Sequence, residues 1–148
     1  MKESNWPNSV LAVICGAAAT VLAFFLSYPL IEWTAGPFFE LNFGVQDPGL
    51  TTNDVIFLLI ITGWMSLAAL IGGIVSALIC QAYPYRHAWA LVFLSLIFYA
   101  YILADSPRRG EMYYIVLMLV CTTGGFLLGS KFGTTIKMRR KKKLQNPS

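Results

Sequence analysis

The amino-acid sequence predicts an all-α integral membrane protein, a four-transmembrane-helix bundle with both the N and C termini in the cytoplasm. Hydrophobic residues make up 57% of the 148 residues and charged residues only 12%, whereas soluble domains carry about 25% charged residues. Four long stretches contain no charged residue: 4–31, 55–85, 87–104 and 112–130. Because a helix needs about 20 mostly apolar residues to cross a bilayer core, each stretch is a candidate membrane span.

We therefore expect a single integral membrane domain over residues 1–148, with spans at about 9–31, 54–82, 88–104 and 112–130 and a basic cytoplasmic tail over 131–148. Short connections join the last three spans, which should make them antiparallel neighbours. The connection over about 33–53 combines turn signals with apolar residues, and we expect it to lie in the membrane interface or to fold back onto the helices. This arrangement leaves no room for a soluble catalytic or nucleic-acid-binding domain.

The distribution of charge predicts the orientation. With four spans both termini share one side, and that side holds nine of the eleven basic residues. The opposite side holds six of the seven acidic residues. Since Lys and Arg accumulate on the cytoplasmic side of membrane proteins, the termini are predicted to be cytoplasmic. The expected location is the bacterial inner (cytoplasmic) membrane, as a multi-pass protein.

Small residues recur at four-residue spacing in three of the expected spans. The clearest run, a glycine zipper pattern, is Cys121, Gly125, Gly129 and Gly133, and softer runs contain Gly73 and Gly16. In lipid, such faces allow helix backbones to approach closely. We expect these glycines to form helix-packing interfaces, and two uses stay open: contact with another membrane protein, or packing between helices of the same chain.

No charged residue lies in the middle of an expected span. Ion-coupled transporters and proton relays commonly use such a residue, so the sequence does not favour these classes. Polar side chains in the spans are expected either to line a solute path or to bond to neighbouring helices and to their own backbone. They are Ser27, Thr62, Ser66, Ser76, Ser95, Tyr99, Thr122 and Thr123.

Four carboxylates at span ends form a possible outer-face polar site: Glu32, Asp54, Asp105 and Glu111. Paired carboxylates can bind a cation or divide acid and base roles, although solvated loop charges show the same pattern. No residue is assigned as catalytic on this basis.

The cysteines and the histidine suggest neither a metal site nor a cofactor. Cys15, Cys80 and Cys121 lack the C-x-x-C spacing of zinc and redox sites, and we interpret them as small buried apolar residues. His87, which follows Arg86, is interpreted as an interfacial residue. We expect no cofactor and no bound metal.

A polybasic tail follows the last expected span. The run from Lys137 to Lys143 carries six positive charges in seven residues. At about 1 kcal/mol for each basic residue near an anionic leaflet, this run should hold the tail at the membrane surface. Contacts with anionic lipid are expected from Arg139, Arg140, Lys141, Lys142 and Lys143. The net charge of +4 therefore points to membrane lipids and not to nucleic acid as a partner.

By elimination, the sequence favours a non-catalytic integral membrane subunit or scaffold that assembles with other membrane proteins, or with itself, through small-residue helix faces. The alternative is a homo-oligomeric channel or carrier for a neutral or lipid-like solute. A third hypothesis is a membrane enzyme that uses Glu32 or Asp105 on the outer face.

Overall fold

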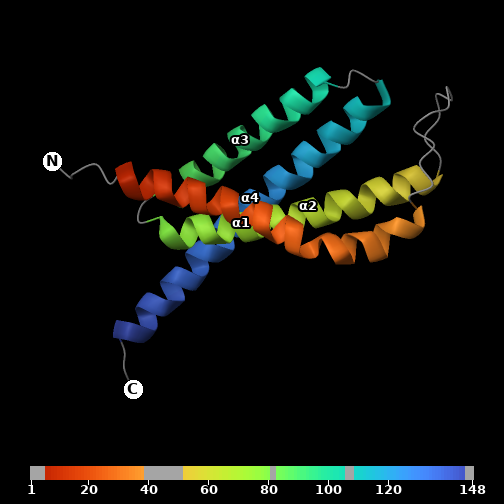
Figure 1. Cartoon of the computed structure of the whole chain (residues 1–148). Coiled ribbons are helices and arrows are strands. Elements are labelled where there is room, and N and C mark those ends of the chain that lie inside the picture. The colour runs from red at the N-terminus through yellow and green to blue at the C-terminus, as the bar shows by residue number, and fades with distance from the viewer. Residues whose placement is uncertain (1–5, 39–51, 81–82, 106–108, 146–148) are drawn as a thin grey trace.

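The computed structural model describes residues 6–38, 52–80, 83–105 and 109–145, and this part of the chain is all-helical, as predicted. Helix α1 spans Trp6–Ala35 and is followed by a short 3-10 helix, η1, at Gly36–Phe38. Helix α2 spans Thr52–Ile79, α3 spans Pro84–Asp105 and α4 spans Arg109–Gln145 (Figure 1). Most of the apolar connection expected over 33–53 falls outside the described residues, so its predicted interfacial position is not tested.

Three helical stretches in the described part of the chain are long and apolar enough to cross a membrane: Asn8–Ala35, Val55–Ile79 and Ile115–Lys142. The first contains the span expected at 9–31, and the other two contain most of those expected at 54–82 and 112–130. By length and composition these helices are those of a membrane protein. The span expected at 88–104 lies in α3, which is helical but is not among the three. The role of α3 as a span therefore stays a prediction.

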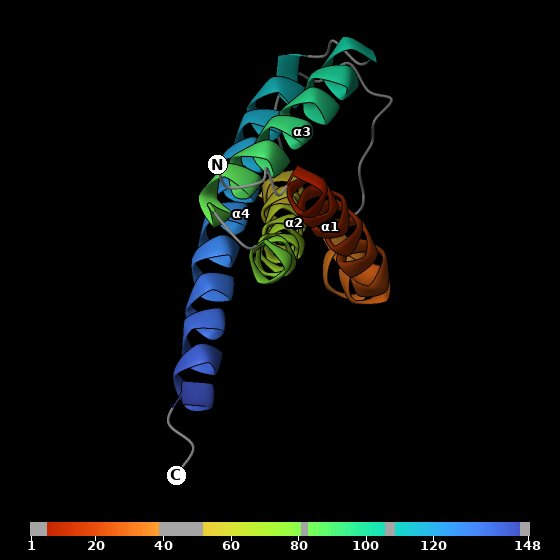
Figure 2. The same cartoon turned by 90° about the vertical axis from the view of Figure 1, so that its left-hand side faces the viewer.

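Helix α2 is the centre of the arrangement. It packs most extensively against α4 and α1 and also contacts α3, whereas α1 and α4 do not contact one another in the described residues. Figure 2 shows α2 lying between α1 and α4, with α3 against the α4 side. The antiparallel order expected for the last three spans is confirmed by the way α2, α3 and α4 run back and forth along the molecule.

Residues of different size occupy the inside and the outside of the helix assembly. Small residues are buried where helices meet, including Ala12, Ala69 and Ala77. Large apolar side chains point outward instead, with Phe25, Leu26 and Trp33 exposed by 67%, 72% and 79%. In water this surface would be unfavourable, but lipid tails are as apolar as the side chains themselves. The packing therefore suits a lipid environment.

Two larger clusters complete the core. One joins α2, α3 and α4 through Ala69, Leu91, Val92 and Phe126, and the other consists of Tyr99, Ile115 and Met118. The second cluster lies between α3 and α4. Together they hold the α3–α4 hairpin onto α2 near its middle.

Helix α4 continues well past the span expected at 112–130. Its 37 residues correspond to about 55 Å at 1.5 Å per residue, and its C-terminal part projects beyond the other helices (Figures 1 and 2). Thr134 and Thr135 bond back to the carbonyls of Ser130 and Lys131. No proline interrupts the sequence between Gly133 and Gln145, so the basic tail begins as a continuation of the helix.

Candidate functional site

The glycine face of α4 lies against α2. A Cβ atom added to Gly125 would stand 2.5 Å from the Ser66 carbonyl oxygen and 3.0 Å from the Ala69 Cβ. A Cβ on Gly129 would overlap the carbonyl oxygen of Leu70. Distances below 3.0 Å are essentially never seen for a real Cβ, so the two backbones can approach this closely only because glycine has no side chain.

The other glycines of this group also lie at helix contacts. A Cβ on Gly133 would stand 2.8 Å from the Ala77 Cβ, and one on Gly73 would stand 2.5 Å from the Phe126 carbonyl oxygen. At the α1–α2 contact, a Cβ on Gly16 would lie 2.9 Å from the Ser76 Cβ. All five glycines expected at packing interfaces thus face helices of their own chain, and their faces are not open to a partner.

An open small-residue position lies elsewhere on α2, at Gly63. A Cβ there would meet nothing within 4 Å, and Leu59 and Leu67, one turn away on either side, are exposed by 57% and 53%. Together with Thr34, Ile60 and Trp64 they line a shallow groove of about 460 Å³, the Gly63 groove. The indole N–H of Trp64 donates to the Thr34 hydroxyl at 3.3 Å, which fixes the wall of the groove.

Polar side chains within the helices bond mainly to their own backbone. The hydroxyls of Thr20, Ser27, Ser95 and Thr122 donate to carbonyls three or four residues earlier, at 2.7–2.9 Å. Ser66 makes a contact between helices, since its hydroxyl donates to the Cys121 carbonyl at 3.1 Å. Bonding to the backbone thus accounts for these hydroxyls, whereas the buried hydroxyls of Thr62 and Ser76 have no hydrogen-bond partner among the described residues.

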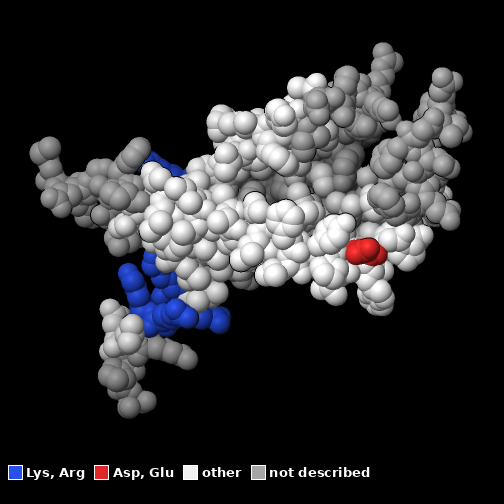
Figure 3. All heavy atoms as spheres, in the orientation of Figure 1, with Lys and Arg blue, Asp and Glu red and all other residues white. Residues whose placement is uncertain are grey.

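The described residues do not form a site from the four outer-face carboxylates. Glu32 is exposed, and it is the one acidic residue whose side chain the structure describes. The side chains of Asp54, Asp105 and Glu111 lie outside the described part. In Figure 3 the described acidic side chain stands at the opposite end of the described part of the molecule from the described basic ones.

The basic end of the molecule contains a polar cluster that sequence reasoning missed. The thiol of Cys80 lies 3.1 Å from Nδ1 of His87, and both residues are buried, with exposed fractions of 4% and 7%. The same Nδ1 atom lies 3.0 Å from the Tyr83 carbonyl oxygen. Cys80 immediately follows α2 and His87 lies in the first turn of α3, so the short connection between these helices creates the contact.

The turn itself has a specific geometry. Tyr83 has a φ of 56°, a left-handed conformation that is uncommon outside glycine, and Pro84 begins α3, where its missing N–H costs no hydrogen bond. The Arg86 amide donates to the Tyr83 carbonyl at 3.0 Å, and the Arg86 guanidinium lies 4.6 Å from the centre of the Tyr83 ring. These contacts hold the chain so that His87 turns back toward Cys80.

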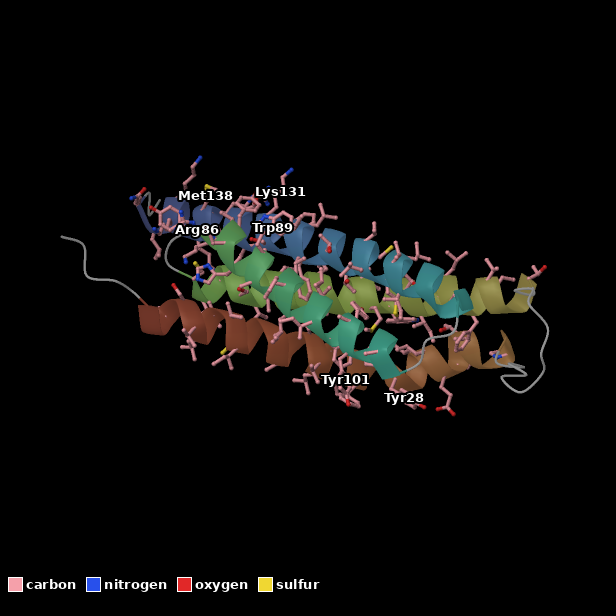
Figure 4. All side chains as sticks on the ribbon, turned by 90° about the horizontal axis from the view of Figure 1, so that it is seen from above. Tyr28, Arg86, Trp89, Tyr101, Lys131 and Met138 are labelled. Atoms are coloured by element: carbon pink, nitrogen blue, oxygen red, sulfur yellow. The ribbon has the colours of Figure 1, made fainter. Side chains whose placement is uncertain are left out.

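Helix α4 closes the cluster. The ammonium of Lys137 donates to the carbonyls of Cys80 and Leu78, which lie at the C-terminal end of α2, where carbonyls lack partners within the helix and the helix dipole is negative. Beside it is a cavity of about 120 Å³, the Cys80 cavity. It is lined by Ala77, Cys80, Pro84, Thr134, Lys137, Met138 and Lys141. Figure 4 shows Arg86, Trp89, Lys131 and Met138 toward this end of the molecule.

The interpretation of the three cysteines as plain apolar residues therefore needs revision at one position. None of the three forms a disulfide bond within the described residues, and Cys80 is buried whereas Cys15 and Cys121 are half-buried. Cys80, however, has a titratable neighbour and lines a cavity. The signal available in the sequence was a cysteine and a histidine seven residues apart on either side of a Tyr-Pro turn.

Comparison with known proteins adds no relative. No protein-family model matches the chain, and no curated protein and no solved structure matches it either. What this protein does must therefore be inferred from its own residues and their packing.

Proposed function

We propose that this protein is a non-catalytic integral membrane subunit, or scaffold, that assembles with another membrane protein through the Gly63 groove. The observation that carries the proposal is the contrast between two kinds of glycine in α2 and α4. Gly125 and Gly129 are covered by α2, whereas Gly63 is exposed, and a Cβ added there would meet no atom of the described residues within 4 Å.

An uncovered glycine in the middle of a membrane helix has a cost. Glycine disfavours the helix by about 1 kcal/mol relative to alanine, and no other helix in the described part of the chain comes within 4 Å of a Cβ added there. A partner helix that presents a bulky side chain would fill the notch between Leu59 and Leu67 and make the close contacts that drive association in lipid. The bond between Trp64 and Thr34 supports this by holding the groove in shape before the partner arrives.

The proposal includes the orientation of the helices in the membrane. The described basic side chains gather at one end of the helix assembly and Glu32 lies at the other (Figure 3). By the positive-inside rule, the basic end, which holds the C-terminal part of α4, is cytoplasmic. The tail residues Arg139, Arg140, Lys141 and Lys142 are exposed there, in a position to contact anionic lipid of a cytoplasmic membrane.

The other hypotheses have less support. A carrier needs polar side chains turned toward a solute path, but the hydroxyls of Thr20, Ser27, Ser95 and Thr122 bond to their own helices. An outer-face enzyme needs convergent carboxylates, and Glu32 is exposed at its helix end. We therefore retain the subunit as the proposed function.

The test fills the Gly63 groove by a substitution and leaves the glycines of the α2–α4 contact unchanged. The tagged protein is taken from its native membrane into lipid nanodiscs, and the protein mass of each particle is measured. The wild type should carry a stoichiometric second membrane protein, and Gly63→Leu should lose it. Ala18→Leu, which adds the same bulk at another exposed position, is the control and should keep it. A wild-type particle without a second protein, or a Gly63→Leu particle that retains it, would contradict the proposal.

A further inference from the structure

The cluster at the basic end is built for chemistry that the proposed assembly role does not use. We propose that Cys80 is an acyl-acceptor thiol, which takes a long-chain acyl group from an acyl thioester such as acyl-coenzyme A, with His87 as its base. The proposal is independent of the Gly63 groove, since it rests on residues at the turn between α2 and α3 and on α4.

The first observation is the contact between the nucleophile and the base. The Cys80 sulfur lies 3.1 Å from Nδ1 and 3.9 Å from Nε2 of His87, so the imidazole stands directly beside the nucleophile. Thiolate, not thiol, is the nucleophile of cysteine chemistry, so a neutral imidazole at this distance can activate the sulfur. A nucleophile with an adjacent base held in place by a third group is the usual sign of covalent catalysis.

The third group here is the carbonyl of Tyr83. It lies 3.0 Å from the same Nδ1 atom and can only accept a hydrogen bond. Nδ1 therefore carries the hydrogen in this contact and donates it to Tyr83, and the unprotonated nitrogen of the neutral ring is Nε2, which lies 3.9 Å from the Cys80 sulfur and can take the thiol proton. The φ of 56° at Tyr83 belongs to the turn that places this carbonyl, so the local backbone geometry supports this orientation of the imidazole.

The second observation is the position of the thiol relative to the membrane. The apolar stretch of α2 ends at Ile79, one residue before Cys80. Lys137 and Lys141 line the cavity beside the thiol, and Arg139, Arg140 and Lys142 are exposed on the next turns of α4. The sulfur therefore lies at the boundary between apolar helix and basic surface.

This boundary matches one class of donor. An acyl-coenzyme A has a hydrocarbon chain, anionic phosphates and a thioester between them. With its chain in lipid and its phosphates near lysine and arginine side chains, which bind phosphate strongly, its thioester carbonyl would stand at the level of Cys80. The Cys80 cavity of about 120 Å³ gives the carbonyl a place beside the sulfur.

The reaction is balanced without any further reactant. The Cys80 thiol gives its proton to His87, and the thiolate attacks the carbonyl carbon of the donor. The bond from that carbon to the sulfur of coenzyme A breaks, and the departing thiolate takes the proton back from His87. One thioester is consumed and one is formed, with no oxidant or reductant involved.

The experiment uses the full chain in nanodiscs with Cys15 and Cys121 changed to Ala. It is incubated with palmitoyl-coenzyme A, and the intact mass is followed with time. We expect one palmitoyl group, located at Cys80 and removed by neutral hydroxylamine, and none on Cys80→Ser. His87→Gln should acylate about 100-fold more slowly, as expected for removal of a general base. Absence of the thioester on the wild-type Cys80, or an unchanged rate in His87→Gln, would overturn the proposal.

A second arm does not depend on the folding of a variant. The same Cys80 chain is offered the palmitoyl thioester of N-acetylcysteamine, which has the reacting group but no phosphates. We expect this donor to react at least tenfold more slowly than palmitoyl-coenzyme A at equal concentration, because the basic residues cannot hold it. Equal rates would show that the basic surface has no part in donor binding and would refute that element of the proposal.

Discussion

Two adjacent glycines of α4 provide the sharpest test of how the helices pack. Gly125 faces α2, where an added Cβ would lie 2.5 Å from the Ser66 carbonyl oxygen and 3.2 Å from the Leu70 nitrogen. At Gly124 an added Cβ would meet nothing within 4 Å. The variants Gly125→Ala and Gly124→Ala therefore make the same chemical change in the same helix, one inside the contact and one outside it.

The expected difference follows from the atoms involved. Both variants gain helix propensity, worth about 1 kcal/mol for Gly to Ala, so this effect cancels in the comparison. Gly125→Ala also has to separate two backbones, because the atoms it meets belong to the α2 main chain and cannot rotate away. Overpacking of this kind costs about 1–3 kcal/mol, so Gly125→Ala should be less stable than Gly124→Ala by about that amount.

The assay is the free energy of unfolding by SDS titration in mixed micelles, with helix content followed by circular dichroism. Gly124→Ala should be as stable as the wild type or slightly more stable, and Gly125→Ala less stable. If Gly125→Ala were as stable as Gly124→Ala, the close contact between α2 and α4 would be wrong.

Three further results are expected at the basic end. Lys137→Met should lower the free energy of unfolding by about 0.3–1 kcal/mol, because it removes a cation from the C-terminal end of α2. Lys131 lies on the exposed side of α4, so Lys131→Met should not have this effect. Equal effects of the two substitutions would refute the role of Lys137 at the end of α2. Changing Arg139, Arg140 and Lys142 together to Gln should reduce the anionic lipid that copurifies with the protein, at about 1 kcal/mol per residue, and unchanged lipid content by mass spectrometry would argue against the lipid contact. In a cysteine-free background, Gln145→Cys should react with a membrane-impermeant maleimide only from the cytoplasmic side, and Trp33→Cys only from the other side; the reverse labelling would invert the proposed orientation.

Much of the fold could be predicted because a membrane restricts which sequences form spans. Uncharged stretches of about 20 residues must satisfy their backbone hydrogen bonds internally, and helices do so. The four-residue spacing of Gly125, Gly129 and Gly133 likewise predicted a close helix contact. It did not reveal the partner, since the Ser66 and Leu70 carbonyls that meet these glycines lie in another helix more than 50 residues earlier.

The polar cluster at the basic end was beyond sequence reasoning for a local reason. Cys80 follows α2 and His87 lies in the first turn of α3, and their contact depends on the left-handed conformation of Tyr83 and on the tight entry into α3. A cysteine in an apolar stretch is usually an inert core residue, so the spacing of these two residues had no clear meaning until the turn was seen. The contribution of Lys137 depends on α4 continuing as a helix past Gly133, where a flexible tail was equally compatible with the sequence.

The proposed subunit role is tested most directly by photocrosslinking in the native membrane. A photoreactive amino acid is placed at Leu67, beside Gly63 in the groove, and in a second variant at Val116, which is similarly exposed at 58% against 53% but lies on α4. We expect one discrete protein adduct from Leu67 that disappears when Gly63→Leu is added, and none from Val116. Absence of an adduct from Leu67, or the same adduct from both positions, would contradict it.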